Sequence, residues 1–317
     1  MKAVVLHVRD EDWLRFWPRD FPALDWAAHS KLAGAERDIA DADILLLTNR
    51  AASSALGELL RGATALKWIH FLTAGFDRGV AMGLPAGVLV SHSPGATAPA
   101  VAEHALALLL GLCRRLPEMV EEQRAHNWRR DELGGAMRSL QGATVCVVGL
   151  GRVGREVARK LRAFDCRVIA VSRAGEAGGD IEKVFPRPRL REALSEADAL
   201  VISTAADPSS LNLIGEAELA ALKPGAYLIN VARGSIVDEA ALIAALRVGR
   251  LGGAALDVFA EEPLAPESPL WDLPNLIVSP HSAGAGANAY VQRKAMFAEN
   301  LERFRGGRPL LDEYRPV

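Results

Sequence analysis

Short runs of aliphatic and β-branched residues alternate with longer segments of helical periodicity along almost the whole chain. The runs contain few polar residues, as expected for strands that are buried on both faces of a sheet. They span residues 2–8, 42–48, 87–92, 143–149, 167–172, 199–205, 226–232, 253–259 and 276–281. Strands that alternate with helices favour parallel sheets covered by helices on both sides. The sequence therefore predicts an α/β fold built from doubly wound parallel sheets.

The strands fall into two series, and 317 residues are enough for two domains. The helical segment at residues 289–307 follows the last strand of the second series, so it can return to the first series. We expect a substrate-binding, flavodoxin-like domain from residues 1–98 plus 285–317. We expect a dinucleotide-binding Rossmann domain from residues 99–284, with a cleft between the two.

Composition and charge argue against several classes of protein. The net charge is −2 and the mean hydropathy is +0.10, which provides no basic surface for nucleic acid. The first residues lack the pattern of a secretory signal, and the most apolar stretch, residues 105–113, is shorter than a membrane span. Cys113, Cys146 and Cys166 have no metal-ligand spacing. We expect a cytoplasmic protein with reduced core cysteines, no metal, and neither a membrane nor a nucleic acid as partner.

A glycine pattern, VVGLGRVG at residues 147–154, joins a predicted strand to a predicted helix. In such a turn Gly149 permits a tight bend, Gly151 lets the backbone approach a pyrophosphate, and Gly154 lets helix and strand pack closely. Arg152 and Val153 begin the helix, whose N-terminus attracts anions. The alternative is a tight turn that binds nothing. The context of strand, turn and helix favours a dinucleotide site.

The residues after the next strand bear on the choice of cofactor. NAD-binding domains usually place Asp or Glu about 20 residues after the turn, where it binds the ribose 2′-hydroxyl. This chain has Ser172 and Arg173 there instead. A serine and an arginine can bind a 2′-phosphate that a carboxylate would repel. The pattern predicts NADP(H) as the preferred cofactor and NAD(H) as a second one; alternatively, Arg173 faces solvent and NAD binds loosely.

Charged side chains follow three later strands, at the edge where ligands bind in doubly wound sheets. They are Arg233, Asp257 with the nearby Glu262, and His281. An arginine matches a substrate carboxylate, and a histidine can protonate the oxygen of a ketone that accepts hydride. A carboxylate beside the histidine stabilises its protonated form. Each residue alone is more often structural, but together they predict reduction of a 2-keto acid.

These motifs resemble those of the D-isomer-specific 2-hydroxyacid dehydrogenase family, which includes glyoxylate/hydroxypyruvate reductases. The resemblance covers nearly the whole chain. It is carried by TAGFD (73–77), PGATAPAVAEHALALLL (94–110), VVGLGRVGREVA (147–158), LKPGAYLINVARGSIVDEAAL (222–242), GAALDVFAEEPL (253–264) and SPHSAG (279–284). One departure lies at residues 203–208, where relatives commonly have Leu-Pro-Leu-Thr.

The resemblance implies a role for each matching residue. Arg233 would bind the substrate carboxylate, His281 would exchange the proton, and Glu262 would pair with His281. Backbone N–H groups of Ala74 and Gly75 would bind the same carboxylate. Further cofactor contacts would come from Thr204, Val231, Ala232, Asp257 and the segment from His281 to Gly284.

The resemblance further implies a homodimer, with the helix from Ala100 in its interface, and a small substrate such as glyoxylate or hydroxypyruvate. His104 is interpreted as structural. Candidates for the substrate pocket, each also compatible with core packing, are Trp13, Phe76, Met82 and Trp128. Two other functions share the scaffold: a nucleotide-sensing corepressor-like protein, and an enzyme that oxidises formate or phosphite.

Overall fold

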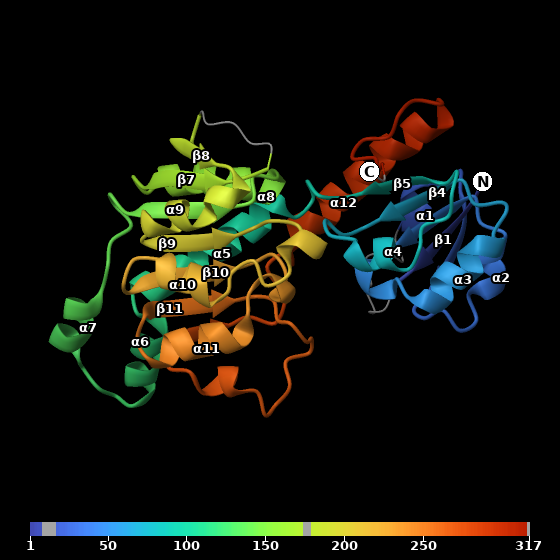
Figure 1. Cartoon of the computed structure of the whole chain (residues 1–317). Coiled ribbons are helices and arrows are strands. Elements are labelled where there is room, and N and C mark those ends of the chain that lie inside the picture. Colours follow the sequence, from blue (N-terminus) through green and yellow to red (C-terminus); the bar gives the residue numbers. More distant parts are fainter. Residues whose placement is uncertain (8–16, 174–178, 316–317) are drawn as a thin grey trace. The chain divides into compact units, whose positions relative to one another are not determined.

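The computed structural model describes residues 1–7, 17–173 and 179–315. The chain divides into two compact units (Figure 1). The first contains Met1–Thr97 and Gly286–Val317, and the second contains Ala98–Ala285. Each unit has its own parallel sheet, so the predicted α/β fold with parallel sheets is confirmed.

The sheet of the first unit has the strand order β2-β1-β3-β4-β5, which is the flavodoxin-like order. Its strands are β1 (Lys2–Leu6), β2 (Asp25–His29), β3 (Ile44–Leu47), β4 (Trp68–Phe71) and β5 (Leu89–His92). Its helices are α1 (Trp17–Asp20), α2 (Glu36–Ala40), α3 (Ser54–Gly62), α4 (Asp77–Ala81) and α12 (Ala287–Arg305), with a 3₁₀ turn at Asn49–Ala51. Phe297 of α12 stacks on Trp17 and Trp68, with ring centroids 5.3 and 5.4 Å away. The C-terminal helix thereby completes the core on one face of this sheet.

The sheet of the second unit has the order β12-β11-β10-β9-β6-β7-β8. Its strands are β6 (Thr144–Val148), β7 (Arg167–Val171), β8 (Lys183–Phe185), β9 (Ala199–Ile202), β10 (Ala226–Asn230), β11 (Leu251–Leu256) and β12 (Leu276–Val278). The chain runs outward from β6 through β7 to β8, then returns to β9 on the other side of β6. Ligands bind at such a reversal, beyond the carboxyl ends of the strands.

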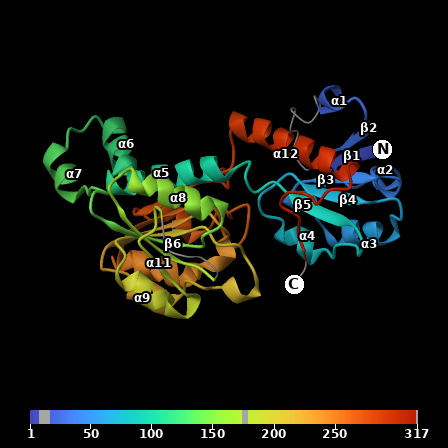
Figure 2. The same cartoon turned by 90° about the horizontal axis from the view of Figure 1, so that it is seen from above.

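Helices cover both faces of this sheet, as the buried strands require. Figure 2 shows α5 and α8 on one face and α9 and α11 on the other. The helices of the unit are α5 (Ala98–Cys113), α6 (Leu116–Arg124), α7 (Arg130–Ala136), α8 (Arg152–Arg162), α9 (Leu190–Ser195), α10 (Glu216–Ala221) and α11 (Glu239–Arg247). Short 3₁₀ turns span Arg187–Arg189, Pro208–Ser210, Gly234–Ile236 and Pro269–Asp272. Two separate apolar clusters lie on the two sides of the sheet.

The structure corrects several predicted elements. Strands β2, β4 and β8 were absent from the predicted set, and each has only three to five residues. The helix expected from Ala100 begins two residues earlier, at Ala98, and ends at Cys113, because Arg115 has a left-handed backbone with φ 56°. A separate helix, α6, then begins at Leu116.

Candidate active site

The glycine turn between β6 and α8 has a different environment at each glycine. A Cβ on Gly149 would lie 2.5 Å from the Thr204 Cα, and one on Gly154 would lie 1.9 Å from the Gly149 carbonyl oxygen. Gly149 also has a positive φ of 99°. Among the described residues, and apart from its chain neighbours, a Cβ on Gly151 would meet no heavy atom within 4 Å. Packing therefore requires the first and third glycines, whereas the second borders open space.

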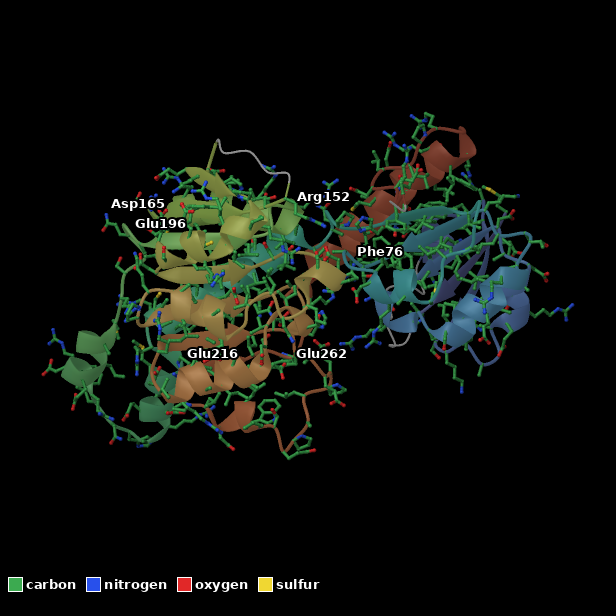
Figure 3. The ribbon with its side chains drawn as sticks, in the orientation of Figure 1. Phe76, Arg152, Asp165, Glu196, Glu216 and Glu262 are labelled. Carbon is green, nitrogen blue, oxygen red and sulfur yellow. The ribbon has the colours of Figure 1, made fainter. Side chains whose placement is uncertain are left out.

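Helix α8 begins at this open space. Its N-cap is Gly151, which has no side chain to accept hydrogen bonds from the first turn of the helix. The free N–H groups and the positive end of the helix dipole favour an anion there. Arg152, the first helical residue, adds a positive charge at the same end (Figure 3). The turn thus fits the pyrophosphate of a dinucleotide.

The end of β7 carries the two residues predicted to select the cofactor. Ser172 is half-buried and Arg173 is exposed. Arg173 Nη1 lies 3.2 Å from Asp207 Oδ2, in the loop after β9. Hydrogen bonds from Ser209, with Arg173 and Arg187 nearby, hold the pKa of the Asp207 carboxyl below its usual range. Sequence reasoning missed Asp207, although the departure at residues 203–208 marked this loop as unusual.

The side chains of His281 and Glu262 contact each other at the carboxyl edge of the same sheet. His281 Nδ1 lies 2.7 Å from Glu262 Oε2, and the other carboxylate oxygen accepts a hydrogen bond from the Phe259 amide at 3.2 Å. The His281 backbone is left-handed, with φ 51°. The imidazole is 37% exposed, so the ring is accessible to a small molecule. Glu262 is labelled in Figure 3.

Asp257 is buried just beyond the end of β11 and holds the loop that carries His281. One carboxylate oxygen accepts hydrogen bonds from the Ser279 hydroxyl at 2.6 Å and the Ser282 amide at 2.9 Å. The other accepts a hydrogen bond from the Ala283 amide at 3.0 Å. His104 Nε2 of α5 lies 3.0 Å from the Ser279 hydroxyl and 3.4 Å from Asp257 Oδ1, and its structural role stays a prediction. The expected nicotinamide contact of Asp257 stays a prediction.

Arg233 follows β10 on a segment with a fixed backbone. Its Nη1 donates a hydrogen bond to the Ala232 carbonyl at 2.7 Å. The buried Asn230 side chain accepts from the Ala232 amide at 3.0 Å and donates to the Arg233 carbonyl at 2.9 Å. Gly234 packs so closely that a Cβ would lie 1.8 Å from the Phe259 carbonyl carbon. The segment after β10 is therefore locked against the segment that leads to Glu262.

The other residues predicted to contact cofactor also belong to the second unit. Thr204 follows β9 and packs against Gly149. Val231 and Ala232 are buried just beyond β10, and Gly284 is half-buried in the loop after His281. Each lies in a segment that follows a strand, so their contacts with a dinucleotide stay predictions that this placement permits.

The predicted substrate loop belongs to the first unit. Ala74 and Gly75 follow β4, and their carbonyls are engaged by His92 Nδ1 and the Thr73 hydroxyl, each at 2.8 Å. The carbonyls of both residues are thus engaged within the loop, and the binding of a substrate carboxylate by their N–H groups stays a prediction. Phe76 stacks on Phe71, with centroids 5.0 Å apart (Figure 3).

The remaining pocket candidates differ in their environment. Met82 is buried, and Trp128 is 92% exposed between α6 and α7. Trp13 lies outside the described residues. Cys113, Cys146 and Cys166 are free, and burial raises the pKa of each thiol to between about 11 and about 12. No helix among the described residues is long and apolar enough to cross a membrane.

Comparison with known proteins defines the class. The family model for the D-isomer specific 2-hydroxyacid dehydrogenase, NAD binding domain, matches residues 106–283. A glyoxylate reductase from Aeropyrum pernix is 36% identical over 275 residues, which cover 85% of this chain and 81% of that protein. The chain therefore belongs to the D-isomer specific 2-hydroxyacid dehydrogenase family, as its motifs predicted.

Two further proteins are similar to this chain over most of its length. A D-3-phosphoglycerate dehydrogenase from Mycobacterium tuberculosis is 37% identical over 278 residues, which cover 84% of this chain but only 51% of that protein. The chain thus spans about half the length of the D-3-phosphoglycerate dehydrogenase. A family member from Xanthobacter autotrophicus, solved with NADPH and MES, is 30% identical, with a TM-score of 0.84 and coverage of 99% of this chain and 98% of that one.

Proposed function

We propose that this protein reduces small 2-keto acids of the glyoxylate or hydroxypyruvate type to D-2-hydroxy acids with NAD(P)H. One observation carries the proposal: the His281–Glu262 pair lies on the same unit, and on the same sheet edge, as the glycine turn and Arg233. A proton donor, a cation for a carboxylate and a dinucleotide turn are together the groups that this reaction needs.

A nicotinamide dinucleotide held by the glycine turn would supply the hydride that reduces the carbonyl carbon of the substrate. Arg233 binds the substrate carboxylate and orients the carbonyl toward His281. The proton passes from His281 Nε2 to the carbonyl oxygen, because Nδ1 faces Glu262. Glu262 stabilises the imidazolium before transfer and fixes the ring orientation. In the oxidative direction His281 accepts the proton.

NADP(H) is the proposed preferred cofactor, with NAD(H) also accepted. Ser172 and Arg173 replace the carboxylate that usually binds the ribose 2′-hydroxyl at the end of the second strand. The similar protein from Xanthobacter autotrophicus, solved with NADPH, supports this choice.

The wider assembly is part of the same proposal. The first unit is the substrate domain, whose Ala74 and Gly75 amides bind the substrate carboxylate. The proposed location is the cytoplasm, which the free, buried cysteines support. The proposed oligomeric state is a homodimer. An apolar groove of about 480 Å³ between α5 and α6, with the exposed Leu116 and Val120 on its wall, supports this dimer.

Steady-state oxidation of NADPH and NADH, followed by absorbance, tests the function. The substrates are glyoxylate, hydroxypyruvate, pyruvate and a bulky phenyl keto acid. His281→Asn removes the proton donor, and His126→Asn is its control, since both histidines are exposed and left-handed, with φ 51° and 57°. Asparagine tolerates that backbone. We expect turnover by the wild type and His126→Asn, and its loss in His281→Asn with cofactor binding retained. Tight cofactor binding by a wild type that turns over no keto acid would refute the proposal and favour a nucleotide sensor.

A further inference from the structure

The ribose end of the proposed dinucleotide site contains a carboxylate as well as a cation. Arg173 Nη1 and Asp207 Oδ2 are 3.2 Å apart, although they come from loops after different strands, β7 and β9. The Arg173 side chain is 69% exposed, whereas Asp207 is 28% exposed. The Asp207 side chain is therefore the more enclosed of the two, and the Arg173 side chain extends into solvent.

The Asp207 side chain is fixed by the turn that it begins. It is the N-cap of the 3₁₀ turn Pro208–Ser210, and its Oδ1 accepts a hydrogen bond from the Ser209 amide at 2.8 Å. The Ser209 hydroxyl donates to the same oxygen at 2.5 Å. Arg187 in turn donates to the Ser209 hydroxyl at 2.7 Å and to the Ser209 carbonyl. Oδ1 is thus occupied by the turn, and Oδ2 is the oxygen that faces Arg173.

A 2′-phosphate and a 2′-hydroxyl place opposite demands on this pair. A phosphate bound by Arg173 would bring its negative charge close to Asp207, because the guanidinium already contacts the carboxylate. Like charges at such a distance repel, and the effect is strong near a partly buried group. An unmodified ribose adds no charge, and its hydroxyl can donate a hydrogen bond to the carboxylate.

We propose that Asp207 is a specificity-determining residue that limits the preference for NADP(H) over NAD(H). It competes with the 2′-phosphate for Arg173, and it provides an acceptor for the ribose hydroxyl of NAD(H). The inference rests on the proposed function, since it assumes that a dinucleotide lies on the glycine turn with its ribose toward Arg173. It would reconcile an arginine at this position with the proposed use of NAD(H) as a second cofactor.

Direct binding tests the inference without turnover. Dissociation constants for NADPH and NADH are measured by calorimetry, and 2′,5′-ADP and 5′-AMP serve as probes of the ribose end alone. Asp207→Asn removes the charge and keeps an N-cap residue, and Asp207→Ser does the same with a shorter side chain. Asp165→Asn is the control, because it removes one exposed acid at the opposite end of α8 from Arg152 (Figure 3).

We expect Asp207→Asn and Asp207→Ser to strengthen binding of NADPH and 2′,5′-ADP by about 10-fold. NADH and 5′-AMP should bind equally well or slightly more weakly, and Asp165→Asn should match the wild type. In an Arg173→Gln background the gain for the phosphorylated ligands should shrink, because the released arginine supplies much of it. An unchanged NADPH-to-NADH ratio in both Asp207 variants, with wild-type melting temperatures, would overturn the inference and leave the proposed function standing. If the wild type binds neither cofactor, the proposed function itself fails.

Discussion

Replacing Gly151 by alanine separates ligand binding at the glycine turn from the packing of the turn. The backbone of Gly151 has φ −72° and ψ −167°, which an alanine adopts without strain. Within the part of the chain that the structure describes, a Cβ there would meet no heavy atom within 4 Å beyond those of the adjacent residues. The substitution should therefore leave the fold intact, with a free energy of unfolding unchanged or higher by about 0.4–1 kcal/mol. The new methyl group occupies the space through which a pyrophosphate would approach the N-terminus of α8.

The size of the binding defect follows from the hydrogen bonds that the methyl group blocks. A hydrogen bond from a backbone amide to a charged phosphate contributes about 1.5–3 kcal/mol. Loss of one such bond would weaken dinucleotide binding by about 10- to 150-fold. Gly154→Ala should behave differently, because its Cβ would lie 1.9 Å from the Gly149 carbonyl oxygen and the turn would have to move. That variant should lose both stability and binding.

Calorimetric titration with NADPH and NADH, together with urea unfolding, measures both effects. Gly62→Ala is the matched control, since Gly62 ends α3 in the first unit and also has no atom within 4 Å of a new Cβ. We expect Gly62→Ala to bind cofactor as the wild type does. A Gly151→Ala protein with unchanged dissociation constants would refute the idea that the pyrophosphate lies on this turn. A large loss of stability in that variant would refute the structural reasoning instead.

Three other perturbations address the catalytic groups and the buried core. Arg233→Ala should raise the KM for the keto acid at least 10-fold (about 1.4 kcal/mol) by removing the cation for its carboxylate, and a near-normal kcat/KM would contradict that role. Glu262→Gln should lower the reductive kcat, because the acceptor that orients the His281 ring from 2.7 Å away is replaced by an amide; an unchanged kcat would contradict this positioning role. Burial, with His92 nearby, lowers the pKa of His70 to about 3, so the unfolded chain binds a proton below pH ~6.5 that the folded chain does not. The contribution of His70 to the free energy of unfolding is complete above that pH and falls by about 1.4 kcal/mol per pH unit as the pH drops toward 3. Urea unfolding at pH 7 and 5 should therefore show a smaller pH dependence of stability in His70→Gln than in the wild type. An equal dependence in the two proteins would contradict the burial argument.

Several strands that sequence reasoning located are uninterrupted apolar runs, whereas β4, which is equally buried, contains a histidine and was missed. Strand β6 is buried at all five positions, and so is β10, so an uninterrupted apolar run was enough to find them. Strand β2 has the sequence DWAAH and no buried position, because it forms the edge of its sheet and pairs only with β1. Strand β8 has three residues and begins with a lysine. Such strands form because they pair through backbone hydrogen bonds with a neighbouring strand. The local sequence does not indicate which strand that neighbour is.

The same distinction applies to the site. Parallel strands place their carboxyl ends at one edge, so a charged residue after a strand could be assigned to the site from the sequence. The partner of each residue could not be assigned in this way. Asp207 approaches Arg173 because β9 and β7 lie on either side of β6, and no spacing between residues 173 and 207 expresses that arrangement. Likewise, the contacts of Asp257 with the amides of Ser282 and Ala283 depend on the loop conformation, not on sequence separation.

Two acidic residues that follow β11, Asp257 and Glu262, hold His281 in different ways. Asp257 is buried and accepts backbone hydrogen bonds, so it fixes the path of the loop beneath the histidine. Glu262 is partly exposed and contacts the imidazole itself, so it fixes the orientation of the ring. Because neither contact involves a ligand, the proposed proton donor, His281, is oriented before any substrate binds. A donor oriented in advance loses little freedom during the reaction, which is the property that makes a positioned general acid effective. The energy that orders this loop therefore comes from folding of the second unit, and substrate binding remains available for orienting the substrate.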